Sequence, residues 1–220
     1  MQQAGPFVVR DGQGGGSRVS AATMENDAPI DVDAAERAMR ALGQDPLFMV
    51  REGHDHLDML LAAKGYLIKD PVTAYAAPIA DIAVTRPQGV KSFVVWPPLA
   101  IQCEIWADGG IGPERVAVMD RVRGDKTTLL GRCSEAAAGS AFIGIDGDCA
   151  MIHALEVSAA FRKQGLARSL TVAAAFWAKA QGATYLTLVT TDANVAANAL
   201  YTSLGMVVVG HYHYRILPKR

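Results

Sequence analysis

The sequence predicts an α/β (α+β) fold in which helices pack against a central sheet. Hydrophobic residues make up 50% of the 220 positions and charged residues 20%, which gives enough apolar mass for a sizeable core. Strand-like apolar runs alternate with segments of helical spacing, and a glycine follows several of the helices. An Asp146–Gly147 pair between two apolar runs predicts a hairpin, so part of the sheet is antiparallel.

The first half of the chain predicts short elements. Strands are expected near 7–10, 18–23, 46–50 and 66–75, and helices near 34–42 and from residue 55 or 56 to Gly65. The glycine-rich segment 12–17 fits a flexible hairpin tip between the first two strands. Asp31 or Asp33 is the expected N-cap of the first helix, and Pro71 would interrupt its strand or confine it to a sheet edge. Residues 78–90 read as a linker.

The second half predicts longer and better defined elements. Strands are expected near 92–96, 127–132, 140–149, 150–157, 184–190 and 206–216, and helices near 98–108, 114–123, 166–181 and 193–204. Asp192 is the candidate N-cap of the last helix. Leu166, Leu170, Ala174 and Trp177 belong to the apolar stripe of the longest helix, which indicates that this helix packs on the sheet.

Four glycines suggest an internal repeat. Gly43 and Gly65 are 22 residues apart, and Gly182 and Gly205 are 23 apart. Each pair brackets the same predicted order of helix, glycine, strand, helix, glycine and strand. Either this match is chance, because helix–glycine–strand is a common sequence, or the N-terminal part repeats the C-terminal half of the fold.

Charge and cysteine content exclude several classes of protein. The formal net charge is −1, so a general electrostatic grip on nucleic acid is not expected. No run of 18 apolar residues exists to cross a membrane, and the first residues do not resemble a secretory signal. The cysteines, Cys103, Cys133 and Cys149, have no metal-site spacing and read as reduced thiols of a cytoplasmic protein.

A loop between a strand and the longest helix is the first candidate site. The segment FRKQGLARSL follows the strand IHALEV and contains Gly165, Ala167 and three basic residues. Small residues allow a ligand close to the backbone, and the first N–H groups of a helix attract phosphate oxygens. The alternative is an ordinary strand–turn–helix connection with solvated basic side chains. The segment lacks the glycine and lysine spacing of a Walker loop.

Polar residues on two further elements are also candidates. Asn194, Asn198 and Tyr201 share one face of the last helix, where they would meet a ligand or solvent. His153 is either a proton acceptor or a hydrogen-bonded core residue, and strand alternation puts the competing base, Glu156, on the opposite side.

The remaining histidines give no metal site. His211 and His213 share a strand face, but no third metal ligand is spaced beside them, so they read as surface or groove residues. His54 and His56, in an apparent loop and helix cap, are read in the same way.

Two motifs in the correct order resemble the GNAT superfamily of acyl-CoA-dependent N-acetyltransferases. The family loop of Gln or Arg, two residues, Gly, one residue and Gly or Ala is matched by Arg162 through Gly165 to Ala167. The later family pattern is matched by Asn194, Ala197, Leu200–Tyr201 and the Gly205–Met206 pair, with Met206 where an aromatic is usual. The resemblance is specific over about residues 139–216.

This resemblance implies a mixed, mostly antiparallel GNAT-like sheet, acetyl-CoA as the cofactor, and roles for named residues. It assigns the cofactor to Leu155, Val157, Arg162, Lys163, Gln164, Gly165, Leu166, Ala167, Asn194 and Asn198. The strand before the loop would splay from its neighbour. Tyr201 would protonate the leaving thiolate, and His153 stands where relatives that acetylate serotonin or polyamines carry a His or Glu near the amine. Glu156 or an ordered water is the alternative base.

The expected protein is therefore an N-acetyltransferase acting on a small-molecule or peptide amine. A non-catalytic acyl-CoA-binding module of the same fold is the alternative, and an unrelated nucleotide-binding protein is disfavoured by the failed Walker pattern. Residues 89–220 would form the GNAT domain, and residues 1–88 a smaller αβ half-domain, which the repeat suggests is a degenerate GNAT half-module. A monomer or a homodimer is expected, with no metal, nucleic acid or membrane partner.

Overall fold

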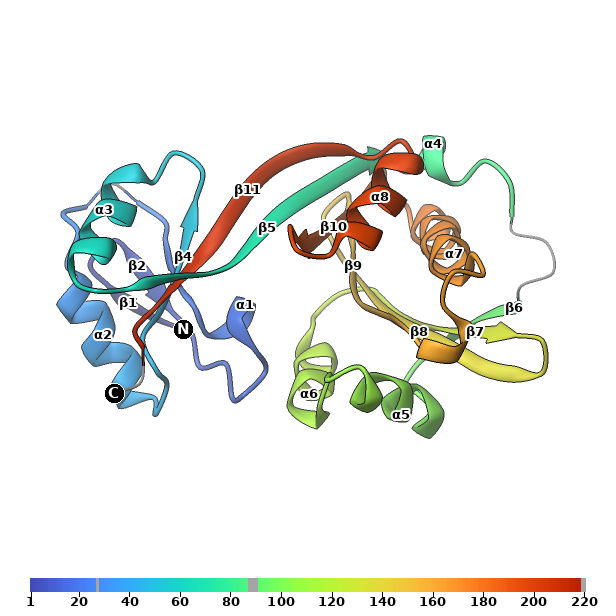
Figure 1. Ribbon diagram of the computed structural model, residues 1–220, viewed down its shortest axis with the longest axis horizontal. Coiled ribbons are helices and arrows are strands. Elements are labelled where there is room, and N and C mark those ends of the chain that lie inside the picture. Colours follow the sequence, from blue (N-terminus) through green and yellow to red (C-terminus); the bar gives the residue numbers. More distant parts are fainter. Residues whose placement is uncertain (27, 87–90, 219–220) are drawn as a thin grey trace. The chain divides into compact units, whose positions relative to one another are not determined.

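The computed structural model describes residues 1–26, 28–86 and 91–218 (Figure 1). The helices are α1 (Ser17–Ser20), α2 (Val32–Ala41), α3 (Asp55–Ala63), α4 (Ile79–Ile82), α5 (Ala100–Asp108), α6 (Pro113–Arg121), α7 (Leu166–Ala180) and α8 (Val195–Ser203), with a 3₁₀ turn at Ala159–Phe161. The strands are β1 (Gln2–Ala4), β2 (Phe7–Val9), β3 (Ala22–Met24), β4 (Leu47–Arg51), β5 (Leu67–Pro78), β6 (Lys91–Val95), β7 (Lys126–Cys133), β8 (Ala136–Asp146), β9 (Cys149–Val157), β10 (Tyr185–Thr191) and β11 (Val207–Ile216).

The chain divides into two compact units. The first contains Met1–Thr73, Thr191–Ala193 and the chain from Gly210 onward, and the second contains Ala74–Thr190 and Asn194–Val209. The predicted boundary between residues 88 and 89 lies outside the described part of the chain. The predicted fold class is confirmed, because helices flank a large and mostly antiparallel sheet.

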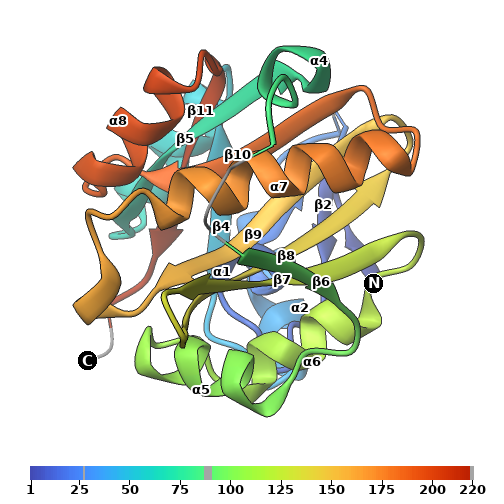
Figure 2. The same cartoon turned by 90° about the vertical axis from the view of Figure 1, so that its right-hand side faces the viewer.

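The second unit is a sheet covered on both faces by helices. Its strands follow the order β11-β5-β10-β9-β8-β7-β6. Helix α7 lies along one face, where Leu166, Leu170 and Ala174 join the core of β7–β10, while α5 and α6 cover the other (Figure 2). The predicted hairpin is confirmed, since Asp146 pairs with Cys149 and Gly147 has a φ of +58°.

The first unit has its own core of Phe7, Phe48, Tyr66 and the apolar side of α2 and α3. Its strands follow the order β1-β2-β3-β4-β11-β5. Asp31 is the N-cap of α2, accepting a hydrogen bond from the Ala34 N–H at 2.9 Å.

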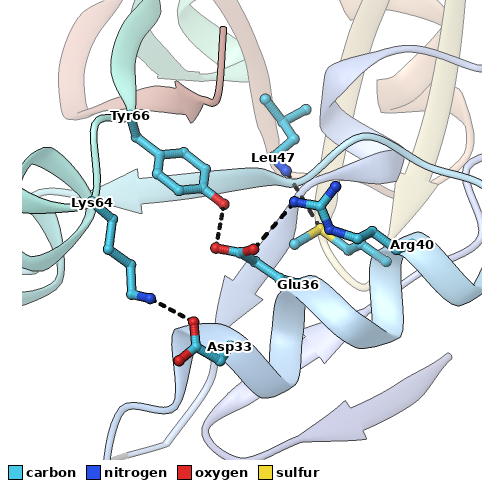
Figure 3. Close-up of polar contacts among 7 residues, drawn as sticks. Asp33, Glu36, Arg40, Leu47, Lys64 and Tyr66 are labelled. Atoms are coloured by element: carbon cyan, nitrogen blue, oxygen red, sulfur yellow. Dashed lines mark hydrogen bonds and ion pairs between the residues drawn. The ribbon is translucent and has the colours of Figure 1, made fainter. Parts of the chain in front are cut away.

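Polar contacts fasten α2 to the residues around β4 and β5 (Figure 3). The Tyr66 hydroxyl donates to Glu36 Oε1 at 2.9 Å, Arg40 pairs with the same carboxylate, and Lys64 pairs with Asp33 (Figure 3). Burial and the Glu36 carboxylate raise the pKa of Tyr66, so this phenol stays protonated and remains a donor.

The two halves of the proposed repeat have the same element order. Helix, glycine, strand, helix, glycine and strand occur as α2–β4–α3–β5 and again as α7–β10–α8–β11. All four glycines, Gly43, Gly65, Gly182 and Gly205, have positive φ and follow a helix. The last strand of each half lies between two strands of the other half, β11 between β4 and β5, and β5 between β10 and β11. The repeat stays a prediction, and this reciprocal exchange is consistent with it.

Three local predictions were wrong. The segment 12–17 does connect two antiparallel strands, β2 and β3, but the second strand does not begin at residue 18, because Ser17–Ser20 is helical and β3 is limited to Ala22–Met24. Gly12 donates to Gln44 Oε1 at 2.7 Å. Pro71 does not confine β5 to an edge. Nor does it interrupt the strand, because β5 runs from Leu67 to Pro78 through the left-handed Asp70 (φ +48°), and the Pro71 carbonyl accepts the Asp192 N–H. Asn194, not Asp192, is the N-cap of α8.

Two further observations concern the cysteines and the hydropathy of the helices. Cys103, Cys133 and Cys149 are free thiols. None of the helices among the described residues is long and apolar enough to cross a membrane.

Candidate functional site

The loop that enters α7 has a conformation suited to close approach by a ligand. Gly165, at the N-cap of α7, has a φ of +79°, and Lys163 has a φ of +61°. A Cβ built on Gly165 would meet no atom within 4 Å, so open space lies over this backbone. Lys163, Gln164 and Gly165 are exposed. The predicted loop residues therefore lie together around an accessible turn.

The N-terminal turn of α7 presents unpaired backbone donors to this loop. The helical ladder begins with the Ser169 N–H bound to the Gly165 carbonyl at 3.0 Å. The N–H groups of Leu166, Ala167 and Arg168 precede that bond and have no acceptor within the helix. Three N–H dipoles and the positive end of the helix macrodipole favour an anion here.

Two glycines of the sheet determine how closely this helix end approaches it. Gly131 of β7 is paired with Gly139 of β8. A Cβ on Gly131 would lie 2.9 Å from Leu166, and one on Gly139 would lie 3.2 Å from both Leu166 and Leu170. The absence of side chains at this pair lets the buried leucines rest on the strands, which fixes the height of the loop above the sheet.

The strand before the loop separates from its neighbour. Paired positions of β9 and β10 run from Cys149 with Tyr185 to Ile152 with Leu188. Both strands continue, β9 to Val157 and β10 to Thr191, with no further pairing between them in the described residues. Leu155 and Val157, the predicted cofactor-arm positions, lie on the stretch of β9 that is paired with β8 but not with β10.

A bulge in β9 overturns one prediction. The register with β8 shifts between His153 and Glu156, and Ala154 has a φ of +50°. The extra residue reverses the alternation, so Glu156 no longer lies opposite His153. His153 contacts the Phe142 ring at 6.0 Å between centroids, and Glu156 lies against Gly109 after α5. Both candidate bases therefore lie on the face covered by α5.

A buried tryptophan holds this bulge. The Trp106 side chain of α5 is fully buried, and its Nε1–H donates to the Ala154 carbonyl at 2.7 Å. Sequence reasoning missed this residue, because nothing in the spacing around position 106 indicates a partner 48 positions later. The available signal was a tryptophan on a predicted helix. If such a side chain is buried, its N–H needs an acceptor.

Arg162 is held by its own neighbours. Its Nη2 donates to Glu156 Oε1 at 3.0 Å, and its Nε donates to the Val157 carbonyl at 3.0 Å. The Arg162 side chain remains 60% exposed, so this ion pair can reorganise at little cost. The structure thus joins the first residue of the loop motif to one of the two candidate bases.

Helix α8 places the second polar motif in the same unit. Asn194 accepts the Ala197 N–H at 3.2 Å, and Asn198 Nδ2 donates to the Asn194 carbonyl at 2.9 Å. The Tyr75 hydroxyl of β5 donates to Asn198 Oδ1 at 2.9 Å, so part of the predicted hydrogen-bonding capacity is already used. Tyr75 is a second residue that sequence reasoning missed.

Tyr201 is enclosed beside Tyr75. The Tyr201 side chain is buried, and the two ring centroids are 5.7 Å apart. Burial raises the pKa of Tyr201 to about 12, because the phenolate is poorly solvated there. The hydroxyl therefore keeps its proton at neutral pH and can act as a donor.

The comparisons with known proteins agree with this geometry. Residues 101–206 match the model of the acetyltransferase (GNAT) family. These residues form a GNAT acetyltransferase domain. The matched range includes the loop, the bulged β9, α7 and α8 with Tyr201. A search of curated proteins finds no match to the chain.

Solved structures share the fold of the GNAT domain and of the residues before it. A conserved protein of unknown function from Staphylococcus epidermidis is 11% identical, with a TM-score of 0.75, over 100% of this chain and 93% of its own. A GCN5-related N-acetyltransferase from Kribbella flavida is 20% identical, with a TM-score of 0.67, over 100% and 89%. A tandem GNAT protein from the clavulanic acid biosynthesis pathway is 14% identical, with a TM-score of 0.64, over 86% and 69%.

The loop of the GNAT domain fits a pyrophosphate group. The open space above Gly165 and the unpaired donors at the start of α7 suit a phosphate group, and the ladder between β9 and β10 ends in the strand before the loop. Acyl transfer is thus the chemistry consistent with the family and with the site.

Proposed function

We propose that the protein is an N-acetyltransferase that transfers an acetyl group from acetyl-CoA to a primary amine of a small molecule or peptide. One observation carries the proposal. The exposed, left-handed Gly165 at the start of α7 follows the strand β9, whose pairing with β10 stops before the loop. Acetyl-CoA, when bound, supplies the activated thioester. The free thiols suggest the reducing cytoplasm as its compartment.

Backbone groups are proposed to hold most of the cofactor. The N–H groups from Gln164 to Ala167 would bind the pyrophosphate, and Arg162 and Lys163 would add positive charge. The backbone of Leu155 and Val157, on the side of β9 that β10 leaves unpaired, would pair with the pantetheine arm, with Asn194 and Asn198 beside it. Arg162 would exchange its contact with Glu156 for a phosphate oxygen, which the exposure of its side chain permits.

Tyr201 is the proposed proton donor to the leaving thiolate sulfur. A phenol whose pKa is raised to about 12 holds its proton until negative charge develops on a neighbouring atom. Its partly enclosed position beside Tyr75 also strengthens the hydrogen bond that it can donate, because few waters compete for it.

His153 is the proposed base that takes a proton from the ammonium group of the acceptor. Glu156 and an ordered water are the alternatives. The Glu156 carboxylate holds Arg162 at 3.0 Å, and His153 lies beside the Phe142 ring on the same face. An unperturbed imidazole has a pKa of about 6.5, which suits proton transfer near neutral pH.

A release assay tests the activity. Free thiol would be measured after mixing the protein and acetyl-CoA with a panel of amines, amino acids and peptides. Thiol release that depends on one acceptor, with an acetylated product of the expected mass, would support the transferase. Tight acetyl-CoA binding with no transfer to any acceptor would favour the alternative, a non-catalytic acyl-CoA-binding module.

Gly165→Glu tests the cofactor loop. The new side chain would have to adopt a φ near +79°, and its carboxylate would repel a pyrophosphate, so we expect acetyl-CoA affinity to fall at least 100-fold. Calorimetry measures the affinity, and thermal unfolding checks the fold. Gly182→Glu is the matched control, because Gly182 has a similar φ of +90° and open surroundings at the other end of α7. Equal loss in both variants would contradict the assignment.

We propose that residues 1–88 are a degenerate GNAT half-module that does not bind acetyl-CoA. The support is the shared element order and the reciprocal placing of β5 and β11. The segment before α2, Glu25 to Asp31, is the counterpart of the loop before α7, and its sequence contains no glycine and lacks the loop motif of Arg162 to Ala167.

A further inference from the structure

A polar pocket in the first unit is built around two histidines of β11. It has a volume of about 340 Å³. The lining residues come from β4 and the turn after it, α3, β5, the segment after β10, and β11: Val50, Arg51, Glu52, Asp55, Asp58, Pro71, Val72, Asp192, His211, Tyr212 and His213. All of them belong to the first unit, whereas the cofactor loop belongs to the second.

His213 is oriented by a carboxylate that is itself fixed. The Nε2 of His213 lies 2.7 Å from Asp58 Oδ1. Arg215 donates from Nε to Asp58 Oδ1 and from Nη2 to Asp58 Oδ2, both at 2.7 Å, and its third nitrogen donates to the Tyr66 carbonyl. A carboxylate only accepts, so Nε2 carries the proton, and Nδ1 of the neutral ring is left as an acceptor.

His211 is oriented by the Thr73 hydroxyl, which is itself bound to Asp192. The Thr73 hydroxyl donates to Asp192 Oδ1 at 2.7 Å, and His211 Nδ1 lies 3.3 Å from the same hydroxyl oxygen. The hydroxyl proton is committed to Asp192, so His211 Nδ1 must be the donor to Thr73. The Nε2 of the neutral ring is then an acceptor. In each neutral imidazole, one nitrogen thus donates to a neighbouring residue, and the other, Nδ1 of His213 or Nε2 of His211, is an acceptor.

The charges around the pocket favour a cation. Glu52, Asp55 and Asp192 contribute carboxylates, and all three residues are exposed. Arg51 also lines the pocket, but its guanidinium pairs with Glu25 Oε1 at 3.2 Å, and the Asp58 charge is balanced by Arg215. The remaining excess of negative charge attracts a positively charged group.

We propose that this pocket binds a small organic cation, a primary amine, through the carboxylates and the acceptor nitrogens of His211 and His213. An ammonium group has three N–H donors and a positive charge, which match acceptor nitrogens and carboxylates together. A metal ion is a poorer match, because among the described residues no three His, Cys, Asp or Glu side chains are grouped closely enough to hold one. The site does not depend on the proposed transferase activity.

Calorimetry with the full chain, without acetyl-CoA, tests the proposal. The probe is 1,4-diaminobutane, and 1,4-butanediol is the neutral molecule of the same shape. We expect one diamine to bind per chain, at least tenfold more tightly than the diol. Equal affinity, or binding of inorganic phosphate in preference to the diamine, would overturn the proposal.

Variants locate the binding. The double variant Glu52→Gln/Asp55→Asn keeps the shape of two exposed side chains and should weaken diamine binding at least tenfold. His213→Gln keeps a donor for Asp58 but removes the second ring nitrogen, and it should weaken binding several-fold. The matched controls are Asp81→Asn and His56→Gln, both exposed and outside the pocket. Wild-type affinity in the pocket variants would place the binding elsewhere.

Two further measurements separate this site from the cofactor loop. NMR spectra of the histidine rings should show shifts for His211 and His213 on adding the diamine, with His56 unchanged. Gly165→Glu should retain diamine binding even where it loses acetyl-CoA. Shifts confined to His153, or loss of diamine binding in Gly165→Glu, would contradict a separate site in the first unit.

Discussion

Tyr201 combines burial, an aromatic neighbour and a place in the α8 motif. Replacement by phenylalanine removes only the hydroxyl, so the packing against Tyr75 is retained. We expect turnover to fall by about 10²–10⁴-fold, as for other general acids, with acetyl-CoA affinity within a few fold of wild type. Steady-state rates and calorimetry measure the two effects. Tyr185→Phe, at an exposed tyrosine, is the control. Unchanged turnover would remove Tyr201 as the acid.

The pH dependence of Tyr201 can be predicted as well. Because burial raises its pKa to about 12, the hydroxyl stays mostly protonated until the pH approaches that value. The pH–rate profile should therefore show no loss of activity from Tyr201 between neutral pH and about pH 11. An alkaline decline in wild type that Tyr201→Phe abolishes would contradict this.

The bulge puts both candidate bases on one strand face, so their positions do not show which one takes the proton. Two variants separate them. His153→Ala should flatten the acidic limb of the pH–rate profile, since protonation of the imidazole would no longer control the rate. Glu156→Gln should leave that limb in place and chiefly change acetyl-CoA binding, because it releases Arg162. The reverse result would make Glu156 the base. His56→Ala, at an exposed histidine, is the control.

At the scale of elements, the contact of α7 with the sheet depends on a glycine pair. A Cβ at Gly139 would lie 2.9 Å from the Glu156 carbonyl and 3.2 Å from Leu166 and Leu170. Since a backbone atom cannot yield as a side chain does, we expect Gly139→Ala to cost about 1–3 kcal/mol of unfolding free energy. Denaturant unfolding measures this cost, and acetyl-CoA affinity should fall with it because β9 and the end of α7 move.

Gly210→Ala is the matched control for Gly139→Ala. Its Cβ would meet no atom within 4 Å, and its φ lies outside the region that disfavours side chains. We expect a change within about 0.5 kcal/mol. If both variants were equally stable, the packing argument for Gly131 and Gly139 would be wrong.

At the scale of the whole molecule, the first unit should be the acid-sensitive one. Hydrogen bonds from Arg215, followed by those from His213, lower the pKa of Asp58 from 3.8 to about 2. A depressed folded-state pKa contributes stability above the unfolded pKa, and this stability is lost as pH falls from about 4 to about 2. After allowance for solvent screening the contribution is about 1–2 kcal/mol.

Thermal unfolding between pH 6 and pH 2 checks this. Asp58→Asn should be less stable at pH 6, because it leaves Arg215, which is 8% exposed, without its carboxylate. The difference from wild type should shrink between pH 4 and pH 2. Asp81→Asn, at an exposed carboxylate, should follow the wild-type curve. A difference that stays constant down to pH 2 would contradict the role of Asp58.

Much of the fold could be predicted because its signals are local. Helical spacing, the Asp146–Gly147 turn and the glycines after α2, α3, α7 and α8 depend on backbone preferences within a few residues. The loop motif and the α8 motif were readable for the same reason. Failures occurred where distant residues intervene: Gln44 reaches Gly12, and Asp192 bonds to Thr73 rather than capping α8.

The candidate site shows the same division. The sequence named Arg162, Gly165, His153 and Tyr201, but strand alternation gave the wrong face for Glu156. A bulge adds one residue and inverts every side chain beyond it, and no local pattern marks its position. Its stabilising contact, Trp106 to Ala154, joins elements far apart in the chain.

The sequence by itself determined the fold class and most of the order of elements, because these follow from short-range chemistry. It also predicted the phosphate-type loop and the repeat suggested by four glycines. Only the tertiary structure decided that β5 and β11 exchange places, that His153 and Glu156 share a face, and that Asp58, His213 and Arg215 form one cluster. These features depend on which distant residues meet. Contacts between distant residues form when the whole chain buries its apolar side chains, so no single segment of the sequence predicts them.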